Sequence, residues 1–424
     1  MEDKNRGGGR PIKLKSFRKI LPVLAIIGPG VITSFADNDP GGITTYSQAG
    51  AAYQYSLLWM LALVTVALGV VQEMCARMGA VTEKGLGELI REEYGVRWAL
   101  FALVTMFVAN LGTTCAEFAG IAMAFEIFGI KRHFSVPIAA FLIWLVVVRG
   151  SFRTVERIFL GLCLVFFSYV GSGVMAKPDW SEVARGLFIP SFHFERQYIV
   201  LFVAVIGTTI TPWMQFFLQS TVVDKGVHIR EYRYTRLDVI VGAFFTDFVA
   251  FFIVVAAGAT LYPHGIRWID NAKQAAMALE PFAGPAAKIL FATGLLSAAT
   301  LSGAILPLTT AYSFCETFGW EFGVRKTYRE APVFYGIFTL SIILGAGIVI
   351  FFGFNLIRFT ILTQVLNGLL LPVVMIFMLK LINNPRIMGK YVNSRIGNVM
   401  CWGTTVSILA LALIYTVMTI FGIG

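Results

Sequence analysis

The chain has 424 residues, of which 57% are hydrophobic and only 14% are charged. Its mean hydropathy of +0.76 and its low charge, against roughly 25% charged residues in soluble domains, exclude an ordinary water-soluble protein. They indicate an integral membrane protein. The net charge of +10 does not indicate nucleic-acid binding, because the basic residues are distributed by membrane topology.

Eleven apolar segments are long enough, or nearly so, to cross a bilayer. They lie near residues 21–52, 54–76, 98–129, 135–148, 156–175, 197–223, 237–262, 286–315, 331–353, 356–382 and 398–423. The fourth is short, and we expect it to be tilted or partly interfacial. The sequence predicts one transmembrane domain over residues 17–424. A basic, disordered cytoplasmic tail precedes it at residues 1–16.

The basic residues predict the orientation of these spans. Of the 34 lysines and arginines, 25 fall in the N-terminal tail and in loops on the same side of the membrane. This bias places the N-terminus in the cytoplasm, and an odd number of spans then places the C-terminus outside a plasma membrane. The five cysteines all lie in or at the ends of predicted spans, so we expect no disulfide framework.

The first apolar segment is interrupted by Asp-Asn-Asp-Pro-Gly-Gly at residues 37–42. Backbone that leaves the helix at membrane depth is tolerated only where it is buried in protein or lines a polar cavity. Carboxylates at that depth are costly and mark ion sites by default. Asp37 and Asp39 therefore indicate a cation site. The alternative for Asp39 is a buried acid that caps the half-helix after it, and for Asp37 a solvated vestibule residue.

The sixth segment is interrupted in the same way, by Thr-Thr-Ile-Thr-Pro at residues 208–212. Two interrupted helices in corresponding halves of a chain indicate the binding site of a secondary transporter. The spacing fits two inverted five-helix repeats, about 21–176 and 197–382, followed by an extra helix at about 398–423. Thr208 and Thr211 either contact the ion, directly or through water, or satisfy the backbone groups freed by the break.

Over nearly its whole length the chain resembles the NRAMP family of divalent-metal transporters. Residues 28–51, with Asp-Pro-Gly-Gly at 39–42, resemble the family's first helix and its Asp-Pro-Gly-Asn motif, and residues 207–212 stand where the family has Gly-Ala-x-x-Met-Pro. Supporting matches are Ala116, Glu117, Gly120, Gln364, Leu371, Pro372, Met388, Gly389 and residues 392–395. The resemblance implies an all-α membrane protein with the LeuT-like five-plus-five fold. Its first and sixth helices would be unwound at mid-membrane.

The ligand positions depart from the family pattern. The resemblance implies that a transition metal is held by the aspartate and asparagine of the first motif, a backbone carbonyl and a methionine sulfur. Asp39 keeps the carboxylate, but Gly42, Thr208 and Thr211 replace the asparagine, alanine and methionine. Loss of the soft thioether removes the discrimination against hard cations, and the smaller Gly42 leaves room for retained water. The pattern resembles the NRAMP-related magnesium transporter branch, which implies transport of partly hydrated Mg²⁺ and of Mn²⁺.

The proton-handling positions differ as well. Thr114 stands where the family has an acid, and Trp213 stands where it has a histidine. We therefore expect alternating access without proton coupling. Asp247, in the seventh segment, replaces a family asparagine and is a candidate for the ion pathway; the alternative is a pairing with a neighbouring helix.

Four further residues are candidates for ligand, pathway or structural roles. Gln364 and Asn367 share one face of the tenth segment and either face the ion or bridge helices. Glu117 either lies on the ion path or makes a structural hydrogen bond to the first or sixth segment, and Asn38 would support the site from beside Asp39.

The sequence gives no indication of an enzyme, because it has no P-loop, no Gly-x-Ser-x-Gly and no His-Glu-x-x-His motif. We expect no cofactor besides the transported ion, and no partner besides divalent ions and the lipid bilayer. Four alternatives stay open: a proton-coupled Mn²⁺/Fe²⁺ transporter that uses other residues, a carrier of a harder cation such as Al³⁺, an organic-substrate symporter on the same fold, and a membrane sensor. Asp37 and Asp39 argue against an anionic organic substrate.

Overall fold

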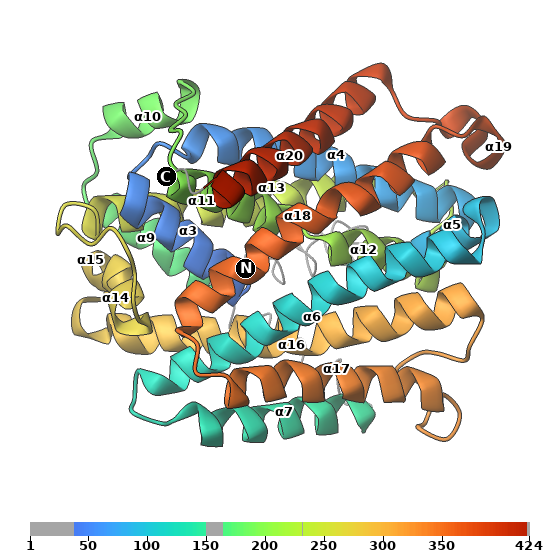
Figure 1. The fold of residues 1–424 in the computed structure, drawn as a ribbon, viewed down its shortest axis with the longest axis horizontal. Helices are drawn as coiled ribbons and strands as arrows, with labels where there is room; N and C mark the ends of the chain where they lie inside the picture. Colours follow the sequence, from blue (N-terminus) through green and yellow to red (C-terminus); the bar gives the residue numbers. More distant parts are fainter. Residues whose placement is uncertain (1–37, 150–163, 231, 422–424) are drawn as a thin grey trace, which may run out of the picture.

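The computed structural model describes residues 38–149, 164–230 and 232–421, and these are helices and connecting loops (Figure 1). The α-helices are α3 (Pro40–Tyr53), α4 (Leu58–Thr82), α5 (Leu86–Tyr94), α6 (Val96–Glu126), α7 (Arg132–Val148), α9 (Phe167–Met175), α10 (Trp180–Phe188), α11 (Arg196–Thr209), α12 (Pro212–Asp224), α13 (Tyr232–Thr260), α14 (Ala272–Ala276), α15 (Glu280–Ala283), α16 (Ala287–Phe318), α17 (Pro332–Phe351), α18 (Leu356–Ile382), α19 (Pro385–Met388) and α20 (Arg395–Phe421). Short 3-10 turns are η1 (Leu164–Phe166), η2 (Met277–Leu279), η3 (Gly284–Ala286) and η4 (Gly389–Tyr391).

Within the described residues, eight helical stretches are long and apolar enough to cross a membrane, and α7 is a shorter apolar helix. Most lie where the sequence predicts spans; α18, for example, covers the predicted 356–382. The prediction of eleven spans stays a prediction, because residues 21–37 and 156–163 lie outside the described part. So do Asp37 and the tail at residues 1–16. The short helices α5, α14 and α15 were not predicted.

Two helices begin at prolines beside the interruptions. α11 ends at Thr209 and α12 begins at Pro212, so Ile210 and Thr211 form a non-helical link. α3 begins at Pro40 directly after Asp39. Proline suits the first position of a helix because its missing N–H would have no partner there.

Glycines bring the helices that surround these breaks into close contact. A Cβ placed on Gly207 of α11 would lie 2.1 Å from the carbonyl oxygen of Gln364 on α18. A Cβ on Gly120 of α6 would lie 2.2 Å from Cγ of Pro40. α11 and α18 therefore meet backbone to backbone, and α6 packs against the ring of Pro40 at the start of α3 (Figure 1).

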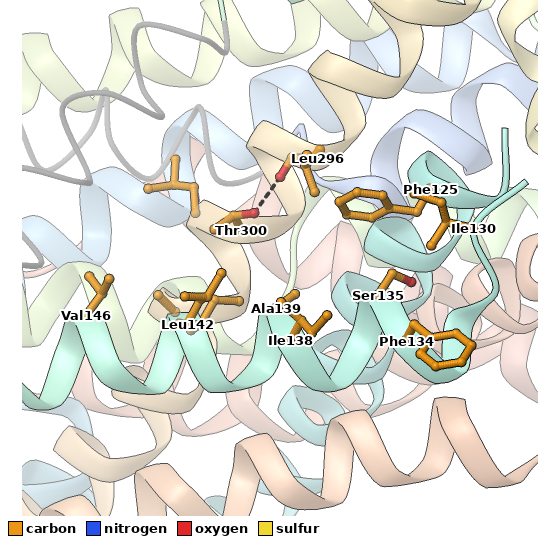
Figure 2. Close-up of a pocket in the computed structure, with 13 residues that line it drawn as sticks. Phe125, Ile130, Phe134, Ser135, Ile138, Ala139, Leu142, Val146, Leu296 and Thr300 are labelled. Atoms are coloured by element: carbon orange, nitrogen blue, oxygen red, sulfur yellow. Dashed lines mark hydrogen bonds between the residues drawn. The ribbon is translucent and has the colours of Figure 1, made fainter. Parts of the chain in front are cut away.

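A groove of about 500 Å³ lies between α7 and α16 (Figure 2). Its walls are aliphatic and aromatic side chains, with Ser135 and Thr300 as the polar members. The Thr300 hydroxyl already donates to the carbonyl of Leu296 at 2.7 Å. With no acidic side chain in its lining, this groove offers nothing that would bind a cation.

We expect Gly207→Ala to destabilise the protein by about 1–3 kcal/mol, because the added methyl group overpacks the α11–α18 contact. Gly347→Ala on α17 is the matched control, since a Cβ there meets nothing within 4 Å. Thermal unfolding of both purified variants in detergent checks the prediction. Equal melting temperatures would show that the two helices do not approach so closely.

Candidate cation site

Asp39 is the N-cap of α3. Its Oδ1 accepts a hydrogen bond from the backbone N–H of Gly42 at 2.6 Å, and its side chain is buried. This bond satisfies one of the free N–H groups at the start of a helix. A carboxylate can accept about four hydrogen bonds, so capping leaves acceptor positions for an ion. Capping and ion binding are therefore compatible roles for Asp39.

Glu117 lies close enough to Asp39 for their carboxyl groups to interact electrostatically. It projects from α6, which Gly120 allows to pack directly against Pro40. Glu117 is fully buried, and no N–H or hydroxyl group of the described residues donates to either of its oxygens. Two adjoining buried carboxyl groups cannot both be ionised unless a cation neutralises them. The pair therefore requires either a shared proton or a bound cation.

Two amides of α18 adjoin this pair. A Cβ on Gly41 would lie 2.0 Å from Nε2 of Gln364, so the Gln364 amide lies against the Asp-Pro-Gly turn. Asn367 donates through Nδ2 to Oε1 of Gln364 and to the hydroxyl of Thr113, both at 2.9 Å. Gln364 thus adjoins the site, while Asn367 orients it and bridges to α6.

Thr208, near the end of α11, and Thr211, in the link to α12, carry buried hydroxyls that have no hydrogen-bond partner among the described residues. By contrast, Thr209 donates to the carbonyl of Val205 at 2.7 Å. With its amide in the favourable orientation, Gln215 donates to the carbonyls of Thr211 and Pro212, the latter at 2.9 Å. Gln215 therefore binds two carbonyls at the start of α12, and the hydroxyls of Thr208 and Thr211 stay available for an ion or its water.

Asp247 lies on α13, and Asn38 makes a hydrogen bond to the same helix. Asn38 donates through Nδ2 to the carbonyl of Thr246 at 3.3 Å, which ties the start of the motif to this helix. The carboxyl group of Asp247 is buried and interacts with the hydroxyl of Thr65 on α4. The structure places Asp247 near the motif, but no contact in the described part joins it to Asp39.

Thr114 and Trp213 are packing residues in this structure. The Thr114 hydroxyl donates to the carbonyl of Asn110 at 2.7 Å, and its methyl group packs against Gly345 of α17. Trp213 is buried on α12 with its ring centroid 5.8 Å from that of Phe217. These contacts give neither Thr114 nor Trp213 a role in the ion pathway.

Two polar residues of α3 were not predicted as site residues. The hydroxyl groups of Tyr46 and Thr209 lie 2.8 Å apart, one residue from Thr208. Gln48 donates to the carbonyl of Arg267 at 2.8 Å and accepts from the N–H of Ile269 at 2.9 Å. For Tyr46 the sequence did carry a signal, namely its position. Tyr46 follows Asp39 by seven residues and so shares its helix face.

The side-chain atoms that could bind a metal ion at this candidate site are oxygens. Among the described residues no group of three His, Cys, Asp or Glu side chains could hold a metal ion. The candidate ligands are the carboxyl groups of Asp39 and Glu117 and the hydroxyls of Thr208 and Thr211, whereas Gln364 turns its Nε2 towards Gly41. Such donors suit hard cations, and Mg²⁺ in particular binds through one or two carboxylates while keeping several waters.

Solved structures with the same fold are transporters. A manganese transporter from Eremococcus coleocola, in complex with an aromatic bis-isothiourea substituted compound, matches 96% of this chain and 88% of its own, with a TM-score of 0.74 at 20% identity. MhsT in complex with L-phenylalanine matches 91% of this chain and 98% of its own, with a TM-score of 0.62 at 13% identity. These similarities show an all-helical transporter fold of the LeuT-like type.

Sequence comparisons identify closer relatives. The divalent metal cation transporter MntH of Erwinia tasmaniensis is 30% identical over 395 residues, which are 90% of this chain and 91% of that protein. The protein of the same name from Pectobacterium carotovorum is 28% identical over 400 residues, 92% of this chain and 93% of that protein. The model of the family "natural resistance-associated macrophage protein-like" matches residues 30–418. The chain is therefore a multi-pass membrane protein of the natural resistance-associated macrophage protein-like (Nramp) family.

Proposed function

We propose that this protein imports divalent cations by alternating access, and that it carries Mg²⁺ with part of its water shell as well as Mn²⁺. The observations that carry the proposal are the buried, interacting carboxyl groups of Asp39 and Glu117, and the buried hydroxyls of Thr208 and Thr211, which have no hydrogen-bond partner among the described residues. The proposal includes eleven spans in two inverted repeats, with the first and sixth unwound. It also includes a plasma-membrane location with a cytoplasmic N-terminus and an external C-terminus.

Selectivity follows from the hardness of the donors. A thioether favours Mn²⁺ and Fe²⁺ over hard ions, whereas the hydroxyl of Thr211 does not. Mg²⁺ gives up its water reluctantly, and the free hydroxyls can accept or donate to retained water without contacting the ion. These properties support placing the protein in the magnesium-transporting branch. They favour a site that accepts Mg²⁺ over one that excludes it.

The membrane potential supplies enough free energy for uptake without a coupled proton. Each charge gains about 2.3 kcal/mol per 100 mV. A divalent cation therefore gains about 4.6 kcal/mol, equivalent to an accumulation of over a thousandfold. The packing roles of Thr114 and Trp213 leave those two positions without a proton-carrying group.

A second candidate function is a proton-coupled manganese transporter. The observation that favours it is again the Asp39–Glu117 pair, which must hold a proton when no cation is present. Cation binding would then release that proton. Under our proposal Glu117 keeps the proton while the ion binds to the ionised carboxylate of Asp39, so no proton leaves the site, whereas a coupled transporter carries protons across the membrane with each ion.

We expect Asp39→Ala to reduce Mg²⁺ and Mn²⁺ uptake by at least about a hundredfold, beyond the 10–100-fold typical of losing an outer-sphere partner of a metal. Asp179→Ala is the matched control, because Asp179 also caps a helix, accepting from the N–H of Ser181 at 2.9 Å, but outside the candidate site. Uptake into proteoliposomes of both folded variants is measured. Retained uptake by Asp39→Ala would show that this carboxylate only caps α3.

Thr211→Met should shift the preference from Mg²⁺ towards Mn²⁺ by about tenfold or more, since a soft ligand replaces a hydroxyl. Thr404→Met serves as the control; its hydroxyl donates to Met400 within α20. Competition between the two ions during uptake measures the ratio. If the ratio is unchanged in Thr211→Met, position 211 does not contact the ion or its water.

Coupling is tested with proteoliposomes that hold a potassium-diffusion potential and an internal pH indicator. We expect Mg²⁺ uptake to follow the potential, to be indifferent to an imposed pH gradient, and to cause no net proton flux. Glu117→Gln should retain uptake driven by the potential. Proton influx in step with Mg²⁺ uptake, abolished in Glu117→Gln, would establish the second candidate function instead.

A further inference from the structure

A second groove, of about 570 Å³, lies between α4, α13 and α20. It opens at the end of the bundle where α13 and α20 begin, beside the loop at residues 391–394. Residues 392–394 of this loop belong to the stretch 392–395, which carries part of the family resemblance. This stretch contributes nothing to the cation site. The groove is therefore a separate feature of the fold.

The polar end of this groove has an excess of positive charge. Arg77 and Glu73 of α4 form an ion pair at 3.2 Å, and Glu73 also accepts from the hydroxyl of Tyr232. Arg236 of α13 approaches Glu73 only to 4.0 Å, and its side chain is 59% exposed. Among the described residues that line the groove, two arginines thus face one carboxylate that is already engaged, which leaves about one positive charge for a ligand.

Arg77 also fixes the loop that forms one wall. It donates to the carbonyls of Tyr391 and Val392 at 3.3 and 3.2 Å, and to Oδ1 of Asn393 at 2.9 Å. Its Nε is buried without a hydrogen-bond partner in the described part of the chain. The positive end of α20, which begins at Arg395, and that of α13, which begins at Tyr232, adjoin the same end of the groove and favour an anion there.

The rest of the groove is apolar and faces the bilayer. Val66 of α4, Phe244 of α13 and Ile396 of α20 are 54%, 61% and 75% exposed. On helices that cross a membrane, such side chains contact lipid tails. Gly69 leaves open space along this wall, because a Cβ there would meet nothing within 4 Å. The groove therefore joins a cationic end to an apolar channel.

We propose that this groove binds an anionic phospholipid. The phosphate lies at the cationic end, beside Arg236 and Arg77, and an acyl chain lies along Val66, Gly69 and Phe244. Basic pockets between transmembrane helices on the cytoplasmic side bind anionic headgroups, and the proposed orientation puts this end in the cytoplasmic leaflet. The bound lipid would tie α13 to α4 and to the start of α20. This inference is independent of which cation is carried.

The test measures how much dioleoyl phosphatidylglycerol the purified full-length protein retains during titration in detergent, by native mass spectrometry. We expect Arg236→Gln to bind it roughly fivefold more weakly, the factor for one cationic side chain at an anionic surface. Arg358→Gln is the matched control, since its side chain is also 59% exposed and also faces an acid, Asp270, at 3.5 Å. Gly69→Leu should weaken binding by blocking the channel, whereas Gly347→Leu, equally open, should not.

Three results would overturn the proposal. Dioleoyl phosphatidylcholine bound as tightly as phosphatidylglycerol would show that charge plays no part. Inorganic phosphate at millimolar concentration that displaces the lipid completely would show a phosphate site without a tail. Equal weakening by Arg236→Gln and Arg358→Gln would show binding to the surface at large. Failure of the cation-transport proposal would leave all of these measurements unaffected.

Discussion

The structure depends on one electrostatic constraint, which is the burial of Asp39 against Glu117. Two carboxyl groups that adjoin in an apolar interior need a proton or a cation, and the surrounding helices are built to bring them together. Gly120 lets α6 pack directly on Pro40, and the N–H of Gly42 orients Asp39. The fold thus places two buried carboxyl groups beside the break that precedes α3. A bound cation would neutralise these carboxyl groups.

Part of this arrangement is predictable from the sequence, because it is local. Proline, glycines and carboxylates inside an apolar run predict a break and favour an ion site, so the candidate role of Asp39 and the start of α3 near Pro40 are readable from residues 37–42. The break before Pro212 is readable in the same way. The bounds of α18 and most spans follow from hydropathy, which varies over twenty residues and needs no knowledge of packing.

What could not be predicted depends on contacts between distant segments. The sequence did not decide whether Glu117 would meet the motif, since that depends on how closely α6 packs. It left Thr208 and Thr211 open between two roles, and only the structure shows that their hydroxyls make no hydrogen bond to the described backbone. The α5 helix was missed because it is short and amphipathic, and the sequence did not say which neighbouring helix Asp247 would face.

The central claim is that a divalent cation, still partly hydrated, sits between Asp39, Glu117 and the link at Ile210–Thr211. The most direct measurement is anomalous X-ray scattering from crystals soaked in Mn²⁺, followed by displacement of the signal with Mg²⁺. The account predicts one strong peak beside the Asp39 carboxylate, with water between the ion and the threonine hydroxyls, and loss of the peak in excess Mg²⁺. A peak elsewhere, or a peak at Asp39 that Mg²⁺ does not displace, would contradict it.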